Sequence, residues 1–262
     1  MRRVLLGSAA VTLLIAPTIA AQATNDESRL TVGVMGGWIG GGPLWSVTQP
    51  VFAIGNRTDQ FALTRRLRSN ITLSGQLSYF PRPNIGWTGE ITFLGIGTHD
   101  QCHLSVDNDD PFNQAACAAI NDRDRAASGM AAAGGVILRP NSRGDIQPYV
   151  RGLVGLALVP RSTTAMTAFF GEFDEYGLLL YDENSSRAAK PMGALGVGFA
   201  TAPRAGYQFR IEFRATAVQL EVIDAPAANS SADPVVGSKW SVLPSITLGL
   251  DIVLEKRRGR RY

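Results

Sequence analysis

The regular alternation of short and long links between eight strand-like segments is the feature that most constrains this chain. Each short link is rich in Pro, Gly or Asn, which suits a tight turn. A soluble sandwich has no reason to lengthen every second link, whereas a barrel that crosses a membrane up and down has short periplasmic turns and long extracellular loops. The expected strands are 30–38, 70–80, 87–97, 129–138, 148–158, 192–200, 207–219 and 240–254, with short links at 81–86, 139–147 and 201–206 and long links at 39–69, 98–128, 159–191 and 220–239.

Residue alternation within the segments agrees with strands that have one apolar face. Between Tyr207 and Ala217 the odd positions are aromatic, aliphatic or Ala, whereas the even positions are polar and three of them are charged. In the last segment Ile246, Leu248 and Leu250 share a face with Ile252 and Leu254. A period of two is also what a soluble antiparallel barrel would show, with its apolar face inside.

Aromatic residues near the segment ends favour the membrane alternative, because Trp and Tyr concentrate at the lipid–water interface. We therefore expect an all-β fold: a closed, antiparallel, up-and-down barrel of eight transmembrane strands. The aromatics are Trp38, Tyr79, Trp87, Tyr207 and Trp240.

The N-terminus has the pattern of a secretory signal peptide. Arg2 and Arg3 precede a mostly apolar stretch, and Ala21-Gln22-Ala23 has the small-x-small form that signal peptidase cleaves after. The alternative is an anchor that stays attached. We expect residues 1–23 to be the signal peptide, 24–255 the barrel domain and 256–262 a basic tail.

The formal net charge of +3 comes from the two ends of the chain. Two positive charges lie in the signal peptide and five in the tail, so the body between them is acidic. The basic isoelectric point therefore does not indicate a nucleic-acid partner.

Cys102 and Cys117 are the two cysteines of the chain. In an exported protein an isolated pair favours a disulfide. Because His99 and His103 flank Cys102, metal ligation is the alternative.

Taken together, the signal peptide, strand number, loop asymmetry and last strand resemble the small outer-membrane β-barrel superfamily, which includes the OmpA transmembrane domain and porin-like surface proteins. Thr247, Gly249, Ile252 and Leu254 are similar to the C-terminal signal read by the barrel-assembly machinery, although that family usually has aromatics at the last positions. The resemblance implies location in the outer membrane of a Gram-negative cell. It also implies contact with outer-membrane lipid and lipopolysaccharide, and a monomer.

An eight-stranded barrel encloses a lumen just wide enough for side chains. Charges of both signs there should pair, so we expect a plugged, ion-paired core, with a gated polar pathway as the alternative. The expected inward charges are Glu90, Arg151, Lys190, Arg210, Glu212, Arg214 and Asp251.

The residues with catalytic chemistry form only one local cluster. A lipid-modifying enzyme would need His99 or His103, with Ser105 and Asp107 nearby, and a solvated loop explains this cluster better. The run 107–110 lacks the Gly and distal Glu of a calcium-binding EF-hand loop. The aromatic stretch 163–181 is expected to extend the barrel strands, with contact to a ligand or partner as the alternative. We therefore expect no enzyme activity, cofactor or metal, and a structural or surface-interaction role. A narrow porin for ions or small solutes is the main alternative.

Overall fold

The computed structural model describes residues 29–254, except for 122–123, 126–127, 143, 160–165, 171–175, 182–188 and 226–234. The expected signal peptide and the basic tail lie outside the described residues. No helix within the described ranges is long and apolar enough to span a membrane.

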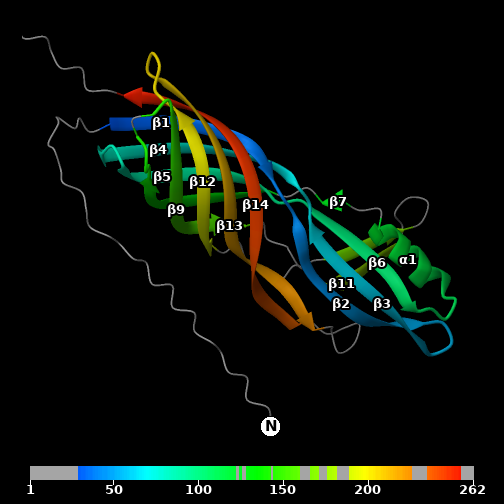
Figure 1. The fold of residues 1–262 in the computed structure, drawn as a ribbon. Helices are drawn as coiled ribbons and strands as arrows, with labels where there is room; N and C mark the ends of the chain where they lie inside the picture. The colour runs from blue at the N-terminus through cyan, green and yellow to red at the C-terminus, as the bar shows by residue number, and fades with distance from the viewer. Residues whose placement is uncertain are drawn as a thin grey trace, which may run out of the picture.

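Eight antiparallel strands form a closed barrel in which each strand pairs with its neighbours in chain order, and β1 closes the ring by pairing with both β4 and β14. The start of β1 and the end of β14 lie at one end of the barrel (Figure 1). The strands are β1 (Arg29–Ile39), β4 (Asn70–Arg82), β5 (Ile85–Gly95), β8 (Ser128–Leu138), β9 (Ile146–Leu158), β12 (Ala189–Thr201), β13 (Tyr207–Ala225) and β14 (Val235–Leu254).

The outer wall of the barrel is apolar and its inner wall is largely polar over the periplasmic half. Along β4, for example, Leu73 and Leu77 are exposed whereas Ser74, Gln76 and Ser78 are buried. A continuous exposed apolar band is the surface that a bilayer covers, and closure leaves no unpaired edge within it. The fold is thus the transmembrane barrel that the sequence predicts. The exposed band includes Val34, Leu73, Leu77, Ile91, Val154, Leu195, Phe209, Phe213 and Leu248.

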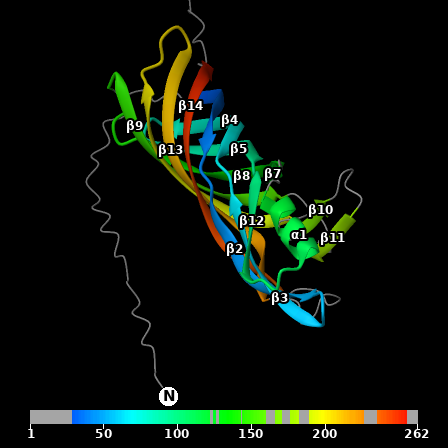
Figure 2. The same ribbon diagram turned by 90° about the vertical axis from the view of Figure 1, so that its right-hand side faces the viewer.

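Three of the four long links, 39–69, 98–128 and 159–191, form strands and a helix that the sequence did not predict. They form a second sheet in the order β2-β3-β6-β7, a helix and a separate two-stranded sheet, β10-β11. These elements gather at the end of the barrel opposite to the start of β1 (Figures 1 and 2). They are β2 (Gly42–Ala53), β3 (Arg57–Leu67), β6 (Thr98–Val106), α1 (Pro111–Asn121), β7 (Asp124–Arg125), β10 (Met166–Phe170) and β11 (Tyr176–Tyr181).

The expectation that residues 163–181 extend the barrel strands is wrong for the part that the structure describes. Strands β10 and β11 pair with each other rather than with the barrel. The reason is visible in their packing, because Met166, Ala168 and Tyr181 are buried in the core beneath the extracellular sheet.

Candidate functional site: a charged lumen below a braced extracellular sheet

Six of the seven charges expected in the lumen are buried inside the barrel, each no more than 7% exposed. They are Glu90, Arg151, Arg210, Glu212, Arg214 and Asp251. The seventh, Lys190, is half-buried toward the extracellular end and forms an ion pair of 2.7 Å with Glu221.

Two arginines and two glutamates form a closed ring of ion pairs across the lumen. Arg151 contacts Glu90 and Glu212 at 2.7 Å each. Arg214 contacts the same two carboxylates, at 2.5 Å and 2.7 Å. Strands β5 and β13, which carry the two glutamates, are four places apart in the eight-strand ring, so this cluster spans the lumen from wall to wall.

A second group lies beside the first. Arg210 contacts Asp251 at 2.8 Å, and the Gln76 amide donates to the same carboxylate at 2.7 Å. The Gln76 carbonyl oxygen accepts from Arg151 at 2.8 Å and from Arg210 at 2.9 Å, so Gln76 joins the two groups. Sequence reasoning missed Gln76 because it considered only charged residues, although the alternation of β4 places it inward.

Glycines on neighbouring strands make room for these side chains. A Cβ atom at Gly33 would overlap the Asp251 carboxylate, and one at Gly196 would lie 2.7 Å from Glu212 Oε1. Both carboxylates are held by arginines and have little freedom to move away. The narrow, charged lumen therefore requires glycine at these two positions.

The periplasmic end of the lumen is closed by a small apolar cluster of Phe80, Ile137, Tyr149 and Ala200. Arg139, just beyond β8, lies over the Phe80 ring with its guanidinium carbon 3.9 Å from the ring centroid. The Tyr149 hydroxyl donates to Glu212 at 2.8 Å and ties this cluster to the ion-pair ring.

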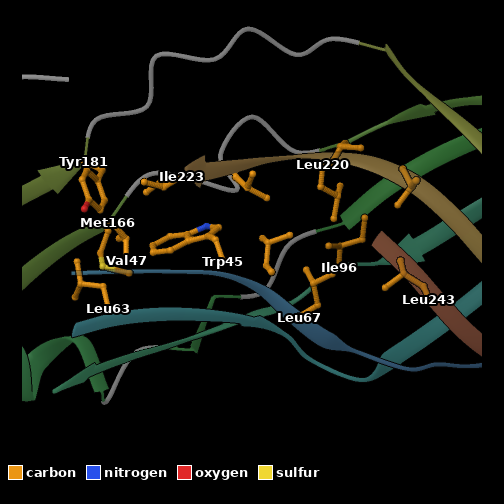
Figure 3. Close-up of a cluster of buried hydrophobic side chains, with 14 of the residues drawn as sticks. Trp45, Val47, Leu63, Leu67, Ile96, Met166, Tyr181, Leu220, Ile223 and Leu243 are labelled. Carbon is orange, nitrogen blue, oxygen red and sulfur yellow. The ribbon is translucent and has the colours of Figure 1, made fainter. Parts of the chain in front are cut away.

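The extracellular half of the lumen is apolar and continues into the core beneath the extracellular sheet. Figure 3 shows Trp45 between Ile223 of β13 and Leu63 of β3, with Leu220 and Leu243 further toward the barrel. Within the described residues, ion pairs thus fill the periplasmic half of the lumen and apolar side chains fill its extracellular half.

A disulfide between Cys102 of β6 and Cys117 of α1 braces the extracellular sheet, as the sequence predicts. The Asn121 side chain adds hydrogen bonds to both backbone polar groups of Cys102, at 2.7 Å and 2.9 Å. On the inner face of the sheet, Arg65 pairs with Asp100 through two bonds of 2.5 Å and 2.7 Å and lies over the Trp45 ring.

The tip of the sheet is held by buried carboxylates. Asp110 caps α1 by accepting from the Phe112 backbone amide at 2.9 Å, and it also accepts from the Ile54 amide at 2.8 Å. Asp59 accepts from Asn108 and Asn113 side chains at 2.8 Å each. Burial alone would raise the pKa of Asp59, but these hydrogen bonds outweigh it and hold the pKa below its usual value.

The histidines, serine and aspartates considered for catalysis or metal binding lie on β6 and in the turn that follows it. His103 and Ser105 are exposed on β6, where Ser105 donates to the Gln60 carbonyl, and Asp107 accepts from Gln114. Within the described ranges no three His, Cys, Asp or Glu side chains are grouped so as to hold a metal ion. The disulfide has removed both thiols from metal ligation.

The residues that resemble an assembly signal lie in β14, on opposite faces. Thr247 is buried in the lumen, whereas Ile252 and Leu254 are exposed on the lipid-facing side. Gly249 lies against Met35 of β1. Their role in assembly stays a prediction.

A scan against protein-family models finds no match. A search of curated proteins also finds no match. Among solved structures, the chain is similar to the outer membrane protein AlkL in DMPC lipid bilayers, with 14% identity over 94% of this chain and 99% of that chain and a TM-score of 0.46. It is also similar to the outer membrane protein OprG from Pseudomonas aeruginosa, with 10% identity over 88% of this chain and 98% of that chain and a TM-score of 0.46. A third similar structure is Ail of Yersinia pestis in complex with the heparin analogue sucrose octasulfate, with 12% identity over 88% of this chain, 100% of that chain and a TM-score of 0.33.

Proposed function

We propose that this protein is a non-enzymatic outer-membrane barrel with a closed lumen, whose extracellular sheet makes contact with other surfaces. The observation that carries the proposal is the ion-pair ring of Glu90, Arg151, Glu212 and Arg214, which spans the lumen. Breaking one buried pair would leave an uncompensated charge, which costs about 3–5 kcal/mol, so the ring opposes spontaneous opening.

The contact role is supported by the braced extracellular sheet and its tip. Phe52, Ile54 and Phe112 are each more than half exposed there, and the hydrogen bonds of Asp110 and Asn113 fix the backbone that carries them. Rigid, exposed apolar side chains beyond the membrane are typical of a contact surface.

Planar-bilayer recording of the full-length protein tests the closed lumen. We expect no steady conductance from the native protein and expect openings when Glu90 and Glu212 are both replaced by Ala. Steady channels from the native protein would instead support the second candidate, a narrow porin, which the polar lining of the periplasmic half favours.

Adherence of cells that express the protein tests the contact surface. Phe52→Ser with Phe112→Ser should reduce adherence of the cells to one another and to a hydrophobic surface. Gln60→Ser on the exposed face of the same sheet is the matched control. Equal adherence of the tip variant and the control, at equal surface levels, would contradict the proposal.

A further inference from the structure

The buried charges of the barrel do not balance. Four arginines face three carboxylates among the described lumen residues that are buried. Three of the arginines are in ion pairs with these carboxylates, and the fourth, Arg139, has no such pair. The arginines are Arg139, Arg151, Arg210 and Arg214, and the carboxylates are Glu90, Glu212 and Asp251.

The Arg139 guanidinium is held inside the periplasmic end of the lumen. The residue is 6% exposed, and its guanidinium carbon lies 3.9 Å from the centroid of the Phe80 ring, which is itself buried. Its backbone amide donates to the Asn84 carbonyl at 2.8 Å, which fixes the start of the side chain. Nevertheless its Nε and Nη2 atoms are buried and have no hydrogen-bond partner among the residues that the structure describes.

The charges around Arg139 make this end of the lumen positive. Arg210 and Arg29 act on Arg139 repulsively, and Asp251 attracts it. Asp251 is already engaged by Arg210 at 2.8 Å and by Gln76 at 2.7 Å. A buried guanidinium with two unused donors and a positive surrounding costs free energy, and an anion that accepts from both donors would offset this cost.

We propose that Arg139 Nε and Nη2 bind a small inorganic anion at the periplasmic end of the lumen. Two adjacent N–H donors of a guanidinium fork suit an anion well, and the anion would balance the fourth arginine. This inference goes beyond the proposed function and does not depend on contacts made by the extracellular sheet.

Thermal unfolding in chloride and in gluconate tests the site with chloride as the probe. The full-length protein, folded in zwitterionic detergent micelles, is compared in the two potassium salts at equal ionic strength, and unfolding is followed by circular dichroism. We expect the native midpoint to be about 2–4 °C higher in chloride, because the anion binds only the folded state.

Arg139→Met should have the same midpoint in both salts. In gluconate it should unfold no lower than the native protein, because the unpaired charge is gone and the unbranched side chain still covers Phe80. Phe80→Leu should lower both midpoints and keep the difference between the salts. Arg57→Gln, an exposed arginine at the far tip of the molecule, is the control for loss of a positive charge and should keep the native difference.

Chloride-35 NMR line broadening gives a direct second measurement, which we expect to be present with the native protein and lost with Arg139→Met. Equal native midpoints in the two salts would overturn the proposal, because water would then suffice for Arg139. Persistence of the salt difference or of the broadening in Arg139→Met would also overturn it, by placing the anion elsewhere.

Discussion

Arg214 and Glu90 are separated by 124 residues and bind each other through two hydrogen bonds, of 2.5 Å and 3.0 Å, inside the barrel. One lies on β13 and the other on β5, on opposite sides of the ring. A bidentate pair of this kind fixes both the distance and the orientation of the two walls. The barrel therefore has a polar crosslink through its centre in addition to the hydrogen bonds around its circumference.

Glu90→Gln should lower the free energy of unfolding by about 3–5 kcal/mol, because Arg151 and Arg214 would share the single remaining carboxylate of Glu212. Urea unfolding in micelles measures this loss. The folded fraction at each urea concentration is determined from the heat-dependent shift in gel mobility. Lys190→Gln is the matched control, because its pair with Glu221 is partly exposed and should contribute less than about 1 kcal/mol. Equal effects of the two substitutions would mean that burial adds nothing to the central pairs.

Gly33→Ala should destabilise the barrel by about 1–3 kcal/mol, because the added methyl group overlaps the Asp251 carboxylate that Arg210 holds in place. Gly75→Ala on the adjacent strand is the control. Its Cβ points outward into open space, so the same substitution should be neutral or stabilising. Urea unfolding should show a loss of stability for Gly33→Ala and none for Gly75→Ala; a loss at both positions would indicate a general requirement for backbone flexibility.

The barrel strands could be predicted because their outer faces are almost uniformly apolar, as between Tyr207 and Ala217. Strand β3 was missed because its buried face carries Asp59 and Arg65 among Phe61 and Leu63, which hides the period of two. These charges are satisfied only by partners distant in sequence, which a local pattern does not reveal. Helix α1 was missed although Asp110, its N-cap, and Pro111, its first residue, are a recognisable start signal.

Arg139 of the candidate site was also missed, because a local sequence pattern does not reveal its contacts with residues distant in sequence. It falls in the short link 139–147, where the sequence predicts a tight turn and not an inward-facing strand residue. Arg139 is buried because it follows the end of β8 and its side chain packs against Phe80 inside the lumen. Six of the seven charges expected in the lumen, by contrast, lie within the expected strands, where alternation determines the face. Lys190 lies just before the expected strand 192–200 and joins β12 in the structure.

Reduction of the Cys102–Cys117 disulfide should loosen α1 while leaving the barrel closed. The crosslink joins residues 15 apart in sequence, and the chain-entropy model gives about 3 kcal/mol for such a loop. We expect faster proteolysis within 98–121 after reduction and an unchanged heat-dependent shift in gel mobility. The Cys102→Ser, Cys117→Ser double variant should be cleaved fast with or without reductant. If reduction also abolished the mobility shift, the extracellular sheet and barrel would be one cooperative unit.

Acidification should release the tip of the extracellular sheet through Asp59. Because the pKa of Asp59 is lowered in the folded protein, its stabilising contribution is complete above the unfolded value of about 4 and is lost as the pH falls through the lower, folded value. Hydrogen exchange of α1 amides, corrected for the intrinsic effect of pH, should therefore increase below about pH 4.

Asp59→Asn separates this cause from general acid unfolding. Three hydrogen bonds converge on the Asp59 carboxylate, one from the Asn108 backbone and one each from the Asn108 and Asn113 side chains. An amide would turn a donor toward one of these donors, so the variant should show fast α1 exchange already at neutral pH and little further change in acid. Asp109→Asn, an exposed acid beside the same turn, should behave as the native protein. Native-like exchange in Asp59→Asn would mean that the carboxylate does not hold the tip, and that the helix cap at Asp110 is sufficient.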